Sequence, residues 1–120
     1  MKLVDITETF ERVYTEAIED PKPIFILRRL TYGEMSNISD ETQVLDEKNR
    51  LIFRGGTSTK LKIKSSLVGW KNIVDKDGKE VPCNSDNKEK LPPSVAIWLI
   101  KEIDILNKLN GIPEEERKNS

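Results

Sequence analysis

The stretch PPSVAIWLIKEIDILNKL, residues 92–109, decides the fold of this chain. Two prolines open it and Gly111 follows its end, which is the usual punctuation of a helix start and a helix stop. At about 100° per residue, four apolar side chains fall on one central stripe. They are Val95, Leu99, Ile103 and Leu106. The stretch therefore predicts a long amphipathic helix, running to about residue 109, whose stripe faces a core.

The other faces of this predicted helix hold the candidate partner-binding residues. Three apolar residues widen the stripe on one side: Trp98, Ile105 and Leu109. The opposite face is made by Lys101, Asp104 and Lys108, with Ile97 among them. The widened flank either packs on a sheet, which we favour, or binds a partner. Ile97 is either a partner contact or an isolated exposed apolar residue, which is common on protein surfaces.

Residues 8–31 predict a first β-hairpin that leads into a helix. The breaker Asp20-Pro21-Lys22-Pro23 separates strand-forming residues from the dense apolar run at residues 24–27. Thr31 is a good helix cap, and Glu34 three residues later completes a capping box. Met35 and Ile38 then continue the helix on one face.

Two further hairpins are predicted. In the second, residues 44–45 and 51–53 flank the polar turn at residues 46–49. The third surrounds Asp77-Gly78 and extends from residue 70 to residue 81. Glycine accepts the positive φ that such a turn requires at little cost.

The segment at residues 58–68 has two conflicting patterns. Residues 60–64 read Lys-Leu-Lys-Ile-Lys, and this alternation favours a strand with one basic face. Thr57 and Ser58 are good helix caps, however, and Gly69 is a good helix terminator. Periodicity alone leaves helix and strand open.

Composition limits the chain to one modest domain. Of its 120 residues, 36% are hydrophobic and 34% are charged, and the net charge is −1. We expect a single α+β domain at residues 1–111, with hairpins packed on the final helix and one or two shorter helices, followed by a short acidic tail at residues 112–120. The lone Cys83 excludes an internal disulfide, and the start of the chain lacks a secretory signal. These features predict a cytoplasmic protein.

The sequence contains few of the residues and motifs that catalysis, phosphate binding or metal binding require. The chain has no histidine, which removes the usual general base and the commonest transition-metal ligand. The segment 55–60 lacks the glycine that a phosphate loop has before its lysine, and the segment 75–80 lacks calcium-loop spacing. Cys83 has no histidine to activate it. We expect a protein that is not an enzyme and has no catalytic, cofactor or metal site.

The near-neutral net charge limits the classes of partner that the chain is expected to bind. Lys60, Lys62 and Lys64 could contact phosphates, but they lack interleaved aromatic residues and the chain is near neutral. A solvated basic face is the simpler interpretation. No run of about 18 apolar residues occurs. We therefore expect neither nucleic-acid nor membrane binding.

Several short stretches carry a family resemblance. They are LTYGEM (residues 30–35), LVGWKN (67–72), DKDGKEVP (75–82), KLPP (90–93) and EEERKNS (114–120). Together they resemble small proteins encoded in the tail modules of tailed bacteriophages and prophages, which are often assigned as tail assembly chaperones. In that pattern the segment before Gly-Trp is helical, so the resemblance favours a helix at residues 58–68.

The resemblance implies a function without catalysis. Such chaperones hold the long tape-measure protein, or another tail protein, soluble in the bacterial cytoplasm until the tail tube polymerises. The implied partner is that tail protein, and self-association stays open. The alternative is a structural tail or head–tail component retained in the virion. A small enzyme that uses only carboxylates or lysine is a third hypothesis.

Overall fold

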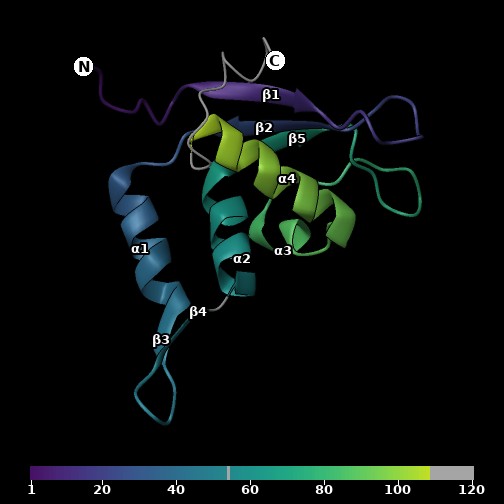
Figure 1. The fold of residues 1–120 in the computed structure, drawn as a ribbon. Coiled ribbons are helices and arrows are strands. Elements are labelled where there is room, and N and C mark those ends of the chain that lie inside the picture. Colours follow the sequence, from purple (N-terminus) through teal and green to yellow (C-terminus); the bar gives the residue numbers. More distant parts are fainter. Residues whose placement is uncertain (54, 109–120) are drawn as a thin grey trace.

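The computed structural model describes residues 1–53 and 55–108, without the side chains of residues 44, 52, 53 and 55. Along the chain the elements are β1 (Thr9–Val13), β2 (Ile24–Arg28), α1 (Tyr32–Thr42), β3 (Gln43–Leu45), β4 (Leu51–Phe53), α2 (Gly55–Ser66), β5 (Leu67–Lys71), α3 (Ser85–Lys88) and α4 (Pro93–Leu106). The four helices lie on one side of a small sheet (Figure 1). The predicted α+β class is confirmed.

The sheet has three antiparallel strands in the order β1-β2-β5. The first predicted hairpin is confirmed, with Phe10 opposite Leu27. Apolar side chains of the central strand β2 point alternately inward, so Phe25 and Leu27 are almost fully buried. Phe25 lies opposite Trp70 of β5 and meets its ring edge-on, with the ring centres 6.4 Å apart.

The third predicted hairpin is confirmed at its turn, and its strands are confirmed only in part. Gly78 has a φ of 78°, and its amide donates to the carbonyl of Asp75 as a tight turn requires. The strand before the turn is β5, however, and it pairs with β2. Around the turn, Val74 and Glu80 form an isolated antiparallel bridge, flanked by hydrogen bonds from the amide of Asp75 to the carbonyl of Lys79 and from the amide of Val81 to the carbonyl of Ile73. Pairing with β2 places Leu67 of β5 opposite Leu27, and both side chains are buried in the core.

The core forms where α4 packs under the sheet. The predicted stripe is confirmed, since its four side chains are the buried residues of α4. They join Phe25, Leu27 and Leu67 in one apolar cluster.

The end of α4 was predicted wrongly, because the helix stops at Leu106 and not near residue 109. The side-chain oxygen of Asn107 accepts the amide of Leu30 at 2.7 Å, and its nitrogen donates to the carbonyl of Ile103 at 2.8 Å. Lys108 then turns away with a φ of 59°. A contact with a distant part of the chain therefore ends the helix. Gly111 and the predicted tail at residues 112–120 lie outside the described residues.

The start of α1 forms as predicted. Thr31 accepts the amide of Glu34, and the carboxylate of Glu34 accepts the amide of Thr31, which makes the capping box. Glu34 also receives two hydrogen bonds from Arg28, one of them at 2.9 Å. These bonds lower the pKa of Glu34 from its usual 4.5 to about 2, mainly through Arg28. The ion pair ties the end of β2 to α1.

The ambiguous segment at residues 58–68 is helical up to Ser66, which confirms the helix prediction for most of its length. Two details differ. Thr57 and Ser58 lie inside α2 and do not cap it, and Gly69 lies in β5. The buried Ser66 donates its hydroxyl to the carbonyl of Arg28 at 2.6 Å. This bond fixes the end of α2 against β2, so the chain passes directly from helix to strand.

The second predicted hairpin, β3–β4, is confirmed. One carboxylate oxygen of Asp46 accepts the amides of Lys48 and Arg50, which closes its turn. Leu45 and Leu51 lie opposite each other and are 64% and 56% exposed. The hairpin projects away from the sheet at the lower end of α1 (Figure 1).

Candidate functional site

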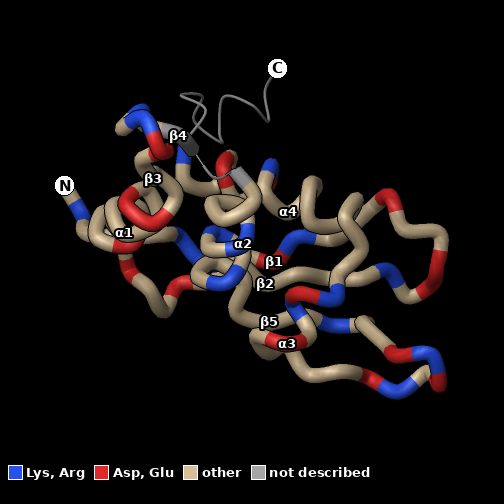
Figure 2. Tube along the Cα trace, turned by 90° about the horizontal axis from the view of Figure 1, so that it is seen from below, with Lys and Arg blue, Asp and Glu red and all other residues tan. Residues whose placement is uncertain are grey.

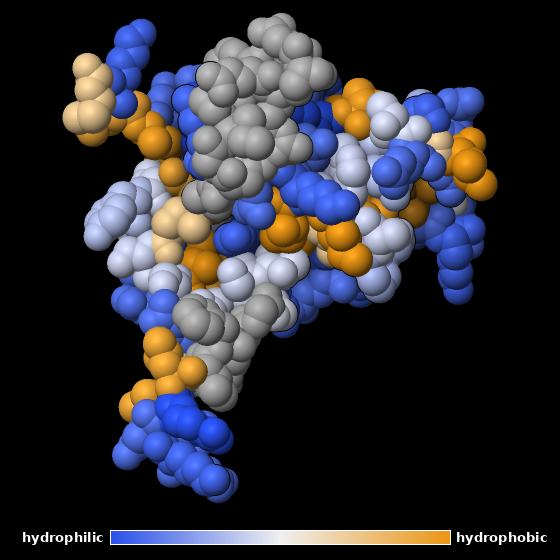
Figure 3. Space-filling view, in the orientation of Figure 1, coloured by the Kyte–Doolittle hydropathy of each residue, from blue (hydrophilic) through white to orange (hydrophobic). Residues whose placement is uncertain are grey.

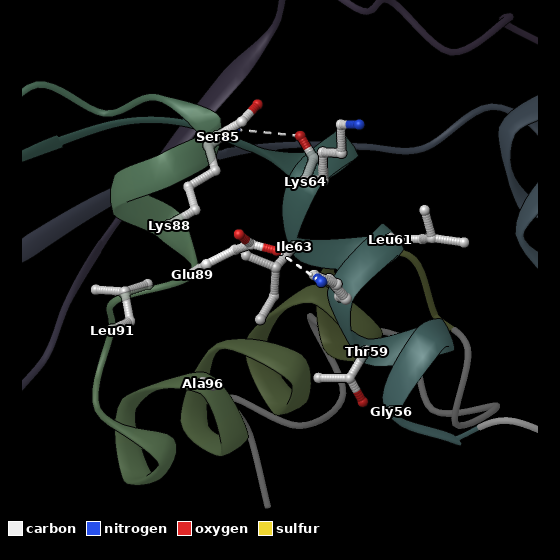
Figure 4. A pocket seen from close by; sticks show the side chains of 11 residues that line it. Gly56, Thr59, Leu61, Ile63, Lys64, Ser85, Lys88, Glu89, Leu91 and Ala96 are labelled. Carbon is white, nitrogen blue, oxygen red and sulfur yellow. Dashed lines mark hydrogen bonds and ion pairs between the residues drawn. The ribbon is translucent and has the colours of Figure 1, made fainter.

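An open pocket of about 710 Å³ lies between α2, α3 and α4. Its apolar lining includes Ile63 from α2, Leu91 from the segment before α4, and Ala96 from the first turns of α4. Figure 4 shows α2 and α3 on two sides of the pocket and α4 along a third. The volume falls within the usual range of ligand pockets. The pocket can accept apolar side chains or a compact apolar ligand.

Charged side chains surround this apolar lining. They are Lys60 and Lys64 of α2, and Lys88 and Glu89 at the end of α3. Figure 2 shows basic positions along α2 and both signs of charge along α3. Three lysines therefore surround the pocket with one carboxylate, although the whole chain is near neutral.

The single carboxylate of the pocket is already paired. Lys60 Nζ lies 2.6 Å from Glu89 Oε1, and this hydrogen bond is the main reason why the pKa of Glu89 is below its usual value. Lys88 donates to the carbonyl of Lys64 at 3.2 Å. Among the described residues, no carboxylate lies within ion-pairing distance of the ammonium groups of Lys64 and Lys88. The pocket therefore has an excess of positive charge.

The predicted basic face does not form one continuous strip. Lys60 and Lys64 line the pocket, whereas Lys62 points toward α4 and pairs with Asp104 at 3.2 Å. The alternating residues 60–64 thus divide between two sides of a helix. This division results from the helical period. In a strand, Lys60, Lys62 and Lys64 would all lie on one face.

The four candidate partner-binding residues have different environments. Ile97 is 60% exposed, next in sequence to the pocket-lining Ala96. Trp98 is half-buried and meets the ring of Tyr14 edge-on, with centres 5.0 Å apart, so it belongs largely to the core. Ile105 is half-buried. Leu109 lies outside the described residues. Over α4, hydrophobic patches alternate with hydrophilic side chains (Figure 3).

Sequence reasoning missed the α3 side of the pocket. Asn84 caps this short helix, because its side-chain oxygen accepts the amide of Asn87 at 2.8 Å. An asparagine followed by Asp86 is a recognisable helix start, so this signal was present. The assembly of α2, α3 and α4 around one pocket was not visible, because it depends on tertiary packing.

The remaining candidate chemistry is limited. The Cys83 thiol is half-buried, and burial raises its pKa, which disfavours the reactive thiolate. Within residues 1–53 and 55–108, no three cysteine and acidic side chains are grouped so that they could hold a metal ion. In the same part of the chain, no helix is long and apolar enough to cross a membrane. Comparison with protein-family models, with curated proteins and with solved structures finds no match.

Proposed function

We propose that this chain is a phage or prophage protein of the tail assembly chaperone type, which binds a tail protein such as the tape-measure protein and keeps it soluble. One observation carries the proposal. Ile97 is exposed on a helix whose buried stripe already supplies the core, and it follows Ala96, which lines an open pocket with apolar side chains. The fold does not need this surface covered, so it is available to a partner.

The surroundings of this surface suit temporary binding. Charged side chains border the apolar groups, among them Lys60, Lys64 and Lys101. A small apolar contact with a charged rim favours complexes that dissociate readily, which a chaperone needs when the tail tube competes for its partner. The resemblance of the sequence to tail-module proteins supports the same function.

Co-expression with the tape-measure protein of the same tail module tests the proposal. We expect this chain to increase the amount of soluble tape-measure protein, and Ile97→Asp to weaken binding by about 1–3 kcal/mol as for a contact near a hot spot. Ile18→Asp is the matched control, because Ile18 has the same side chain, is 94% exposed in the β1–β2 loop, and does not line the pocket.

Two outcomes would contradict the chaperone function. In the first, the tape-measure protein is equally soluble without this chain. In the second, mass spectrometry finds the chain at stoichiometric levels in purified virions, which would favour the structural tail component. Equal losses with Ile97→Asp and Ile18→Asp would show that the surface on α4 is not the contact.

A further inference from the structure

The pocket between α2, α3 and α4 combines an apolar lining with unneutralised positive charge. Its lining residues Ile63, Leu91 and Ala96 offer contact to an apolar group, and Lys64 and Lys88 stand beside them. We propose that this pocket receives an apolar side chain of an acidic amphipathic helix in the partner, whose carboxylates bind Lys64 and Lys88. The inference rests on the proposed function for the existence of a partner, and it adds the chemistry of the bound segment.

The walls of the pocket explain why the occupant is a helix. All three walls are helices or the segment that joins two of them, and among the described residues no strand residue lines the pocket. Backbone groups within a helix are already hydrogen-bonded to one another, so they cannot pair with an added strand. A partner therefore has to bind through side chains, as amphipathic helices do in grooves between helices.

Ile97 supplies a second contact for such a helix. It follows Ala96 on α4 and is exposed, so it lies about 100° around the helix from a side chain of the pocket. Apolar residues spaced three or four apart on a partner helix lie about 5–6 Å from each other. One of them can enter the pocket while the next covers Ile97.

Charge complementarity explains why the helix is acidic. Lys60 is already paired with Glu89, which leaves Lys64 and Lys88 to bind incoming carboxylates. Lys88 holds the Lys64 carbonyl at 3.2 Å and can exchange this bond for a charged partner. The carboxylate of Glu89 and the apolar lining disfavour a nucleic-acid strand, which would bring closely spaced phosphates and few aliphatic groups.

Labelled synthetic peptides test this inference without the natural partner. We would use helical peptides of about 18 residues, long enough to hold helix structure. All carry leucine at every third or fourth position. The first has glutamate beside the leucines, and the second and third have glutamine and lysine there. Fluorescence anisotropy with the full chain should show binding that weakens from glutamate to glutamine and is absent for lysine. Added salt should weaken the glutamate complex.

Charge reversal on the protein locates the binding site. Lys64→Glu combined with Lys88→Glu should weaken binding of the glutamate peptide at least tenfold and create binding of the lysine peptide. Lys76→Glu, in the exposed turn before Gly78, is the matched control and should change neither. Circular dichroism checks the fold. Should the double variant fail to fold, Lys64→Gln replaces it, because Lys64 is exposed and its loss removes one charge.

Three results would overturn the inference: equal binding of all three peptides, equal loss with Lys76→Glu, or displacement of the glutamate peptide by an oligonucleotide of the same charge. The outcome of the co-expression experiment is independent of the outcome of the peptide experiment. If tape-measure solubility requires this chain but the glutamate peptide does not bind the pocket, only the inference falls. If the peptide binds as expected but the tape-measure protein needs no help, only the chaperone function falls.

Discussion

The two β-hairpins of this protein have similar local signals and very different surroundings. In β1–β2, the inner side chains Phe25 and Leu27 are covered by α4, and β5 extends the sheet. In β3–β4, the facing pair Leu45 and Leu51 stays more than half exposed, and the hairpin is a sheet of two strands. Turn residues thus suffice to predict where a hairpin forms, whereas its stability depends on what packs against it.

The largest expected effect comes from a substitution that removes part of the apolar side chain of α4 packed under β1–β2. Ile103→Ala should lower the free energy of unfolding by about 2–5 kcal/mol, because the side chain is fully buried and its loss leaves a cavity. Urea denaturation measures the change. Ile97→Ala on the same helix is the control and should cost less than about 0.5 kcal/mol. Similar losses in both variants would mean that the buried stripe of α4 does not hold the sheet.

Acid should weaken the junction between the first hairpin and α1. The pKa of Glu34 is lowered to about 2 in the folded protein, so its ion pair with Arg28 contributes stability above the unfolded value of 4.5. This contribution is lost as the pH falls from about 4.5 to about 2. Because Glu34 is partly exposed, we expect a loss of no more than about 3 kcal/mol.

Unfolding measured between pH 6 and pH 2 checks this junction, with Glu34→Gln as the control. The variant should be less stable than the parent at pH 6 and should approach it at low pH. A constant difference between the two proteins across this range would contradict the expected titration of Glu34.

The smallest expected effect concerns the exposed hairpin. Leu51→Ser should change the free energy of unfolding by less than about 0.5 kcal/mol, since the side chain is more than half exposed. Hydrogen exchange sharpens the contrast, because the amides of β3–β4 should exchange through local opening and those of β2 only through global unfolding. Equal protection of the amides of β2 and of β3–β4 from hydrogen exchange would contradict the expected difference in stability between the two hairpins.

The sequence predicted those features whose causes are local. The stripe of α4 follows from four apolar residues at helical spacing, and the same spacing placed Ile97 outside it. The capping box at Thr31 and the turn at Gly78 likewise depend on residues within a few positions. Short stretches of sequence are therefore enough to locate these elements.

Errors occurred where distant segments decide the outcome. The strand β5 pairs with β2, about 40 residues upstream, and not with the segment after Gly78. The last turn of α4 is set by the bond between Asn107 and Leu30. The pocket was missed for the same reason, because its lining comes from three helices. Local patterns contain no information about which of these segments meet.

The bond between Asn107 and Leu30 also bears on how the protein is made. It joins positions that are 77 residues apart, and α4 is the last described element of the chain. A ribosome releases β1, β2 and α1 well before α4, at about 5–20 residues per second. For several seconds the inner face of the sheet has no helix α4 to cover it. The newly made chain is therefore itself vulnerable to aggregation until residues 93–106 have emerged.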